Sequence, residues 1–262
     1  MSTTFYSLIL VFLFSISALA QSLDSTSRYL QSDSLIFVSQ KYTDSTFYEG
    51  FTRYGKKHGK GTYNAKDGSI YSGDWVDGKQ HGEGKITLPS GDWYEGEFEQ
   101  GVVNGNGEYH YVRGEIYVGT FKNGLLDGKG VYSFKNGDRY DGEYKNGQRH
   151  GMGTYFYKDG RVYEGSFRFN KKEGIGTMRF PAGDKYVGDF KNNVRSGLGI
   201  IYYISGDRFE GSFLNNKMNG KGTLFYKDGT KLIGTWKNDI QYGTGELIDL
   251  KGNKKPVTFQ TN

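Results

Sequence analysis

The sequence predicts an all-β protein, an elongated, single, twisted antiparallel sheet formed by a meander of tandem β-hairpins. Three observations support this: the composition, a strict 23-residue repeat, and turn residues at two places in every repeat. The chain has 41 glycines, 22 tyrosines and 18 phenylalanines, but 3 prolines and no cysteine. Such a composition indicates short aromatic strands joined by tight turns. The aromatic content argues against a disordered chain, and glycine does not recur every third residue as in collagen.

The segment before the repeats contains a hydrophobic run at residues 8–16, LILVFLFSI. This run is too short for a membrane-spanning helix, which needs about 20 residues. The sequence ALA follows at residues 18–20, a small–x–small pattern that favours cleavage by signal peptidase. We therefore expect residues 1–20 to be a signal peptide cleaved after Ala20, which makes the mature chain secreted or periplasmic. The alternative is that the run remains as an uncleaved anchor.

The repeat is defined by an aromatic or apolar residue that is followed two residues later by glycine. It covers residues 48–254, in nine copies without insertion or deletion. The leading residues are Tyr48, Tyr71, Tyr94, Tyr117, Tyr140, Tyr163, Tyr186, Phe209 and Leu232. Counted from them, glycine occupies positions 3, 12, 14 and 21 in every repeat and position 8 in the first five. All glycines of the chain fall in this register, so we expect nine structurally equivalent hairpins.

Two turns are predicted in each repeat. Position 8 is glycine, asparagine or aspartate in all nine repeats, and these residues tolerate a positive φ. Position 8 is therefore expected to be a left-handed turn residue, as in Asn123-Gly124. A second turn is expected at positions 20–21, as in Asp67-Gly68. The turns leave two antiparallel strands of about six residues per repeat.

Side-chain alternation assigns the two faces of the sheet. Positions 1, 3 and 5 of the first strand and 12, 14, 16 and 18 of the second are expected on one face, which is aromatic and rich in glycine. We expect its rings to lie over bare glycine backbone of the neighbouring strand, and sheet twist to make this side concave. Residues 21–47 are expected to be a loose segment with an edge strand over Ser34–Tyr42. Residues 255–262 are expected to be a cap with a strand over Val257–Phe259.

The pattern Tyr-x-Gly-x-aromatic, then Gly, then His-Gly-x-Gly resembles the MORN repeat family. The fifth repeat, YDGEYKNGQRHGMGTYFYKDGRV, is close to its consensus, although the histidine is present only at His58, His81 and His150. The resemblance implies an elongated sheet of hairpins. It also implies membrane-associated scaffolding, protein docking and, in some members, phospholipid contact or self-association.

The residues that could carry chemistry do not form a recognisable catalytic or metal site. The Gly-x-Gly pairs precede strands, so no helix start is available to bind phosphate. His58 and His81 lie one repeat apart, about 9–10 Å, which is too far to share a zinc ion, and we expect them to hydrogen-bond near the turn. Glu95 and Glu97 lie on an open strand face, where pKa tuning is weak. We therefore predict no enzymatic activity, no catalytic residue, no metal and no cofactor.

The formal charge is +5, and basic residues gather around the turns at positions 8–12. We expect a basic rim for anionic lipid formed by Lys56, Lys57, Lys79, Arg149, Lys171, Lys172, Arg195 and Lys217. Each cation near a membrane surface adds about 1 kcal/mol. The alternative is a charged stripe that keeps an exposed sheet soluble. Interleaved carboxylates and the expected export disfavour nucleic acid, and no small-molecule substrate is expected.

From the fifth repeat onward the polar face becomes apolar. The residues of this apolar patch are Met152, Phe156, Ile175, Val187, Leu198, Ile200, Tyr202 and Phe225. Exposed apolar patches mark contact surfaces, so we expect a protein partner or a second copy of the chain to dock here. The alternative is that the C-terminal tail around Val257–Phe259 covers the patch.

The aromatic face offers a third candidate surface. Its rings would line an aromatic trough formed by Tyr94, Phe98, Tyr117, Tyr132, Tyr140, Tyr155 and Tyr163. Such a trough would suit an extended peptide or a glycan, and the alternative is that the rings are simply the core. The leading interpretation is an exported, non-enzymatic scaffold that binds protein or membrane surfaces. The second is a carbohydrate- or peptide-binding module that uses the trough.

Overall fold

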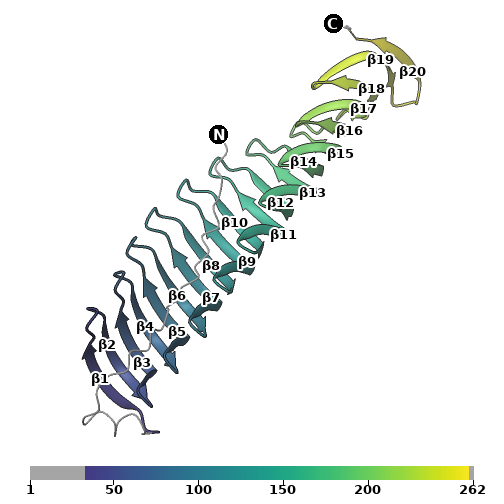
Figure 1. The fold of residues 1–262 in the computed structure, drawn as a ribbon. Coiled ribbons are helices and arrows are strands. Elements are labelled where there is room, and N and C mark those ends of the chain that lie inside the picture. The colour runs from purple at the N-terminus through teal and green to yellow at the C-terminus, as the bar shows by residue number, and fades with distance from the viewer. Residues whose placement is uncertain (1–32, 260–262) are drawn as a thin grey trace. The chain divides into compact units, whose positions relative to one another are not determined.

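The computed structural model describes residues 33–259, which form one open antiparallel sheet of twenty strands and contain no helix (Figure 1). The predicted all-β fold of tandem hairpins is confirmed. The strands are β1 (Ile36–Lys41), β2 (Phe47–Arg53), β3 (Lys56–Asn64), β4 (Ile70–Val76), β5 (Lys79–Thr87), β6 (Trp93–Glu99), β7 (Val102–His110), β8 (Ile116–Lys122), β9 (Leu125–Ser133), β10 (Arg139–Lys145), β11 (Gln148–Phe156), β12 (Val162–Arg168), β13 (Lys171–Arg179), β14 (Lys185–Lys191), β15 (Val194–Tyr202), β16 (Arg208–Leu214), β17 (Lys217–Phe225), β18 (Lys231–Lys237), β19 (Ile240–Ile248) and β20 (Lys254–Thr258).

The described residues divide into two compact units. The N-terminal unit comprises residues 33–135 and 144–147, and the C-terminal unit comprises residues 136–143 and 148–259. In the first, each strand from β1 to β9 pairs antiparallel with the next along the chain. In the second, the same holds from β11 to β20. Each unit is therefore a meander.

The tight turn of each repeat uses two left-handed residues. Position 8 has a positive φ in all nine repeats, as predicted, and position 7 has one too, as at Asn123 (φ 51°) and Gly124 (φ 76°). Two consecutive positive φ angles define a type I′ turn, whose twist matches that of the strands it joins. Tyr54 and Phe169 also occupy position 7 with φ near 50°, an uncommon conformation for bulky residues. Tyrosine and phenylalanine are not typical turn residues, so the sequence did not predict a positive φ at these two positions.

The second turn spans positions 18–22. In the first repeat, Ala65 N donates to Ser69 O (2.8 Å) and Gly68 N donates to Ala65 O (3.0 Å). Asp67 Oδ1 accepts a hydrogen bond from Ser69 N (2.8 Å), and Gly68 has a φ of 90°. The glycine at position 21 thus closes the loop in the left-handed region, and the predicted second turn is confirmed.

A β-bulge at position 12 was not predicted. Gly73 pairs with Gly84, but Asp74 pairs with His81, so two residues of β5 have no partner in β4. The bulge glycine is left-handed in every repeat, with φ from 56° to 102°. Position 4 stabilises the bulge, since Asp74 Oδ2 accepts a hydrogen bond from Glu83 N (3.2 Å). Simple alternation had placed position 12 on the aromatic face, which is wrong because the bulge resets the alternation there.

The core consists of tyrosine rings packed over paired glycines. Tyr94 is 0% exposed, and its hydroxyl donates to Glu97 O (3.0 Å). A Cβ added at Gly107 would lie 2.4 Å from the Tyr94 hydroxyl, so only glycine leaves room for the ring. The expectation that rings lie on bare glycine backbone is confirmed. Phe98 and Phe121 contact the same ring edge-to-face, with centroids 5.2 and 5.0 Å away, and extend the column of rings.

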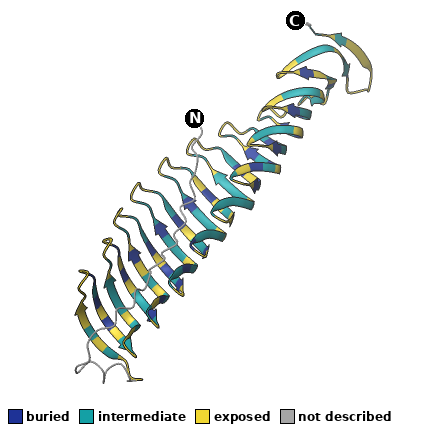
Figure 2. Cartoon of the chain, in the orientation of Figure 1, coloured by how far each residue is buried: buried dark blue, intermediate teal, exposed yellow. Residues whose placement is uncertain are grey.

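This packing removes the expected aromatic trough. Of its seven residues, Tyr94, Tyr117, Tyr140 and Tyr163 are 0% exposed, Phe98 and Tyr132 are buried, and Tyr155 is half-buried. Figure 2 shows buried positions, in dark blue, recurring along the strands. A ligand would have nothing to stack on, because each ring is covered by the ring of the next repeat. Three grooves lie on the opposite, polar face.

The expected basic rim also separates into two groups. Lys56, Lys79, Lys171 and Lys217, at position 9, are exposed, whereas Lys57, Arg149, Lys172 and Arg195, at position 10, turn toward the rings. Consecutive residues of a strand point to opposite faces, so one rim cannot include both positions. Lys172 is 9% exposed and its Nζ donates to the Tyr157 hydroxyl (2.9 Å). Burial, with the nearby charges of Arg161 and Arg149, lowers the pKa of Lys172 to about 8.

The terminal strands cover the two ends of the repeats. β1 pairs with β2, with Phe37 opposite Phe51, and β20 pairs with β19, with Val257 opposite Gly245. Because residues 254–258 run along β19, this part of the tail does not cover the apolar patch. The expected signal peptide, residues 1–20, lies outside the described residues. Nowhere between residues 33 and 259 is there a helix with the length and hydrophobicity needed to cross a bilayer.

Gly107→Ala should lower the free energy of unfolding by about 2 kcal/mol or more, because the new methyl group overlaps the Tyr94 ring. The matched control is Gly234→Ala, at the equivalent glycine pair of the last repeat. There Leu232 replaces the tyrosine, and the nearest atom to an added Cβ is 3.7 Å away. Its stability should be unchanged or raised by up to about 1 kcal/mol. Urea denaturation measures both, and equal losses would contradict the ring-on-glycine account.

Lys172→Met should stabilise the protein at pH 7 by about 1–2 kcal/mol. Lowering the lysine pKa from 10.5 to about 8 corresponds to about 3 kcal/mol, of which contact with the rings returns about 1–2. Met218 already occupies the same position two repeats later. The charged lysine destabilises the fold fully below pH 8. Between pH 8 and 10.5 Lys172 is neutral in the folded state but still charged in the unfolded state, so the penalty falls as the pH rises. The difference between variant and wild type should therefore shrink over that window in denaturation curves. A constant difference would argue against a buried charge.

Candidate functional site

The polar face carries positions 2, 4, 13, 15, 17 and 23, and strand pairing aligns them into three rows across each unit. In the C-terminal unit, the apolar row is formed by the position-13 residues Met152, Ile175 and Leu198. The central row includes Val187, which pairs with Ile200. The basic row runs from strand to strand through Arg179, Lys185, Tyr202, Arg208, Phe225 and Lys231. These rows bring all eight residues of the predicted apolar patch to one face of one unit.

A groove, here called the C-terminal groove, opens between the apolar and central rows. It has a volume of about 470 Å³ and is lined by Ile175, Val187, Asp189, Leu198, Ile200 and Glu210, with Gly188, Gly199 and Gly211 between them. Ile175 is 70% exposed and Leu198 67% exposed. Val187 and Ile200 are half-buried against one another. The groove thus has backbone and β-branched residues in its base and two aliphatic side chains standing in solvent.

The acidic residues of the groove already have partners within the chain. Asp189 Oδ2 accepts a hydrogen bond from Leu198 N (2.9 Å), which is the bulge contact of this repeat. Glu210 Oε1 lies 2.9 Å from Arg208 Nε. Each carboxylate therefore already has one partner within the chain. These contacts within the chain explain why acidic residues occur at positions 2 and 4 although this face is not anionic.

Two lysines of the basic row have no carboxylate partner among the described residues. Lys185 Nζ lies over the Tyr202 ring, 4.3 Å from its centroid, and Lys231 makes no ion pair. Between residues 162 and 233, positions 2, 4, 13, 15, 17 and 23 carry five basic residues and three acidic ones, which sum to +2. They are Arg179, Lys185, Arg208, Lys221 and Lys231 against Glu164, Asp189 and Glu210. The basic row was not predicted, although the recurrence of Lys or Arg at position 23 was visible in the sequence.

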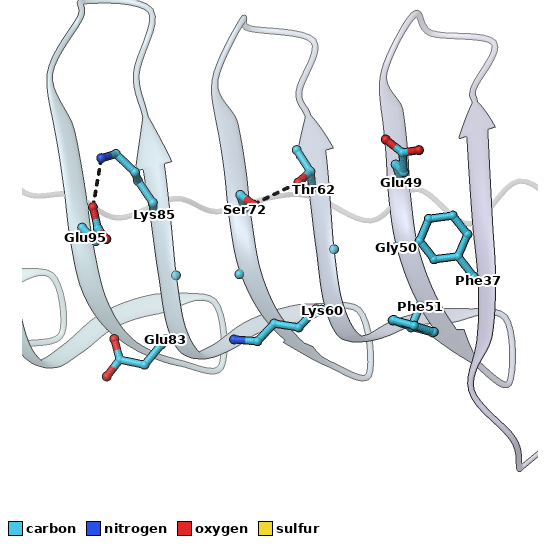
Figure 3. A pocket seen from close by; sticks show the side chains of 13 residues that line it. Phe37, Glu49, Gly50, Phe51, Lys60, Thr62, Ser72, Glu83, Lys85 and Glu95 are labelled. Carbon is cyan, nitrogen blue, oxygen red and sulfur yellow. Dashed lines mark hydrogen bonds and ion pairs between the residues drawn. The ribbon is translucent and has the colours of Figure 1, made fainter.

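The equivalent groove of the N-terminal unit is lined mainly by polar and charged side chains, with Phe37 and Phe51 at one end (Figure 3). It has a volume of about 500 Å³, and its two lysines, Lys60 and Lys85, each form an ion pair with an acidic residue of a neighbouring strand. Lys85 Nζ lies 2.9 Å from Glu95 Oε2, and Thr62 Oγ1 is 3.0 Å from Ser72 Oγ. Glu97 accepts hydrogen bonds from Asn106 and so supports a bulge rather than forming a catalytic pair with Glu95. The exposed aliphatic side chains that distinguish the C-terminal groove are absent from this groove's lining.

His58 forms the expected hydrogen bond near the tight turn, but His81 does not, because its buried Nδ1 has no hydrogen-bond partner among the described residues. His58 Nδ1 accepts a hydrogen bond from Asp77 N (3.4 Å), which belongs to the turn of the next repeat. The ring of His150 contacts Phe169, whose centroid is 5.9 Å away. In the described part of the chain, no three histidine or acidic side chains come together in a way that would hold a metal ion.

Solved structures with similar sheets share little sequence with the chain. The TCP domain of SAS-4 from Drosophila melanogaster, solved with a proline-rich motif of Ana2, is 17% identical, with a TM-score of 0.39 over 59% of this chain and 85% of that one. The TCP10 domain of Danio rerio CPAP, solved with a STIL peptide, is 9% identical, with a TM-score of 0.39 over 85% and 99% of the two chains. No curated protein sequence matches the chain.

The family comparison covers most of the repeats. The MORN repeat model matches eight consecutive segments, at residues 48–70, 71–93, 94–116, 117–139, 140–160, 163–185, 186–208 and 209–231. The ninth repeat, residues 232–254, lies outside these matches but has the same two strands, bulge and turns. MORN repeats are generally non-enzymatic scaffolds for protein or membrane interaction, and the match indicates no catalytic family. The chain belongs to the MORN repeat family.

Proposed function

We propose that this chain is a non-enzymatic scaffold whose C-terminal groove binds an apolar, acidic segment of a partner protein. The observation that supports this most is the exposure of Ile175 and Leu198, at 70% and 67%, beside the half-buried Val187 and Ile200. Burying an exposed aliphatic side chain of this size contributes about 1.5–3 kcal/mol. Two such residues supply the central apolar contacts that a small protein interface needs.

The charge of the polar face favours an acidic partner. Lys185 lies on β14, beside the C-terminal groove, and Lys231 lies on β18, two strands beyond it. The charged residues at positions 2, 4, 13, 15, 17 and 23 between residues 162 and 233 sum to +2. Carboxylates of a partner facing these lysines would add selectivity and speed association more than they would add affinity. The groove's own acids would not repel such a partner strongly, because Asp189 and Glu210 are engaged with Leu198 N and Arg208.

Membrane contact is the weaker of the two binding modes that the family suggests. The exposed cations of the expected rim are Lys56 and Lys79 in one unit and Lys171 and Lys217 in the other. At about 1 kcal/mol for each cation near an anionic surface, two cations per unit contribute about 2 kcal/mol. This corresponds to weak association, so we place the protein partner first.

We also propose that the protein is exported. The support is the hydrophobic run at residues 8–16 followed by ALA at residues 18–20, the order of a signal peptide. A partner in the secreted or periplasmic space would then meet the C-terminal groove outside the cytoplasm.

Selection of a random peptide library on the purified chain should enrich sequences that combine apolar residues with aspartate or glutamate. Their binding should fall at least tenfold in the double variant Ile175→Thr, Leu198→Thr, because the two side chains that they bury are lost. Threonine is the residue that the ninth repeat carries at the same position, as Thr244, so the strands should remain folded.

The matched control is Ile204→Thr, which removes an aliphatic side chain of similar exposure, 74%, from a loop outside the C-terminal groove. It should bind the enriched peptides like the wild type in fluorescence anisotropy. Peptides that bind the double variant as tightly as the wild type, or a selection that enriches nothing, would overturn the proposed site.

N-terminal sequencing of the protein isolated from its native source should begin at Gln21, since cleavage after Ala20 fits the small–x–small pattern. A chain that still carries Met1 or the hydrophobic run would contradict export by a cleaved signal peptide. That result would not bear on the proposed binding at the C-terminal groove.

A further inference from the structure

The apolar row has a regular spacing that restricts what can bind across it. Met152, Ile175 and Leu198 occupy position 13 of three consecutive repeats, two strands apart each time. Neighbouring strands are about 4.8 Å apart, so successive residues of the row lie about 9.6 Å apart. All three are exposed, at 55%, 70% and 67%. A partner segment that crosses the strands must place one apolar side chain on the same side every 9.6 Å or so.

Among regular backbone conformations, polyproline II fits this spacing best. It has three residues per turn and a rise of about 3.1 Å, so every third side chain returns to the same side after about 9.3 Å. An α-helix returns after seven residues, about 10.5 Å, and a β-strand after two residues, about 6.6 Å. Over the two intervals of the apolar row, the accumulated mismatch is about 0.6 Å for polyproline II and about 1.8 Å for the helix. The repeat of a β-strand, about 6.6 Å, does not match the spacing of about 9.6 Å.

The side chains around the groove also suit that conformation. A polyproline II segment makes no internal hydrogen bonds, so its carbonyl groups are free to accept hydrogen bonds from a binding surface. Hydroxyl groups are available at Thr177 and Ser212, which are half-buried beside the groove. Aromatic side chains favour such segments, and the basic row, which runs beside the groove's lining, contains Tyr202 and Phe225.

We propose that the C-terminal groove binds a polyproline II segment with an apolar side chain at every third residue and carboxylates between them. The apolar residues pack on Met152, Ile175 and Leu198, and a carboxylate between them faces Lys185, which lies on β14 within the same span. This inference rests on the proposed function, since it names the conformation and charge of the partner at the same groove. It commits to a partner protein rather than to a second copy of the chain.

The test uses three labelled peptides and residues 21–262 of the chain in fluorescence anisotropy. The first repeats Leu-Pro-Glu over enough triplets to span three repeats, the second repeats Leu-Pro-Lys, and the third is an acidic helical heptad peptide with as many leucines as the first. The Leu-Pro-Glu peptide should bind at least tenfold more tightly than the other two. Ile175→Thr with Leu198→Thr should weaken it at least tenfold, and Lys185→Gln should reduce its preference over Leu-Pro-Lys.

The outcomes separate this inference from the function on which it rests. If the helical peptide binds more tightly and loses affinity in the Ile175→Thr, Leu198→Thr variant, the groove is a binding site but the polyproline II inference is wrong. If none of the three peptides binds and the library selection enriches nothing, both are wrong. If sedimentation shows a dimer that Leu198→Thr dissociates and Ile204→Thr does not, a second copy occupies the groove, which overturns the inference.

Discussion

The contact between a tyrosine ring and two bare glycines is the interaction on which the rest of this structure depends. A single-layer sheet has no second layer to bury its apolar side chains, so each repeat must build its own core. The leading ring does this by lying on the glycine pair formed by positions 3 and 14, as Tyr186 does on Gly188 and Gly199. The ring is 0% exposed, yet its hydroxyl donates to a backbone carbonyl, so no polar atom is left unsatisfied. Burial also raises the pKa of these phenols, to about 12 for Tyr48.

The ring packing explains why the proposed binding site lies on the polar face. The rings contact one another from repeat to repeat, and position 10 adds cations or aliphatic residues that cover them further. The aromatic face is thereby closed by the chain itself. The glycine pairs that hold the rings present only backbone to the opposite face, where Gly188, Gly199 and Gly211 line the base of the C-terminal groove. The same small residues therefore support the core on one side and leave space for a partner on the other.

The polar face differs between the two units because the side chains at positions 13, 15 and 2 are free to vary. They do not contribute to the ring packing, so changes there cost the fold little. In the N-terminal unit these positions carry lysines and glutamates that pair with each other, as Lys85 does with Glu95. In the C-terminal unit they carry Ile175, Leu198 and Ile200, which have no such partner. An identical backbone thus offers a self-neutralised surface in one unit and an apolar groove in the other.

The period, the two turns and the position of the rings on glycine could be predicted from the sequence, because each depends on local backbone conformation or on neighbours at a constant spacing. The residues of the apolar patch could also be predicted, since alternation along a strand is local. Three features could not be predicted, because they depend on the bulge at position 12 and on cross-strand pairing. They are the faces on which positions 9 and 10 lie, the burial of Lys172 and the location of the grooves. A glycine such as Gly82 can occupy either a bulge or a regular strand position. The bulge is identified only by the pairing of Asp74 with His81. The tertiary structure alone decided which cations are buried among rings and which remain available to a partner, because burial is set by side chains a full repeat away.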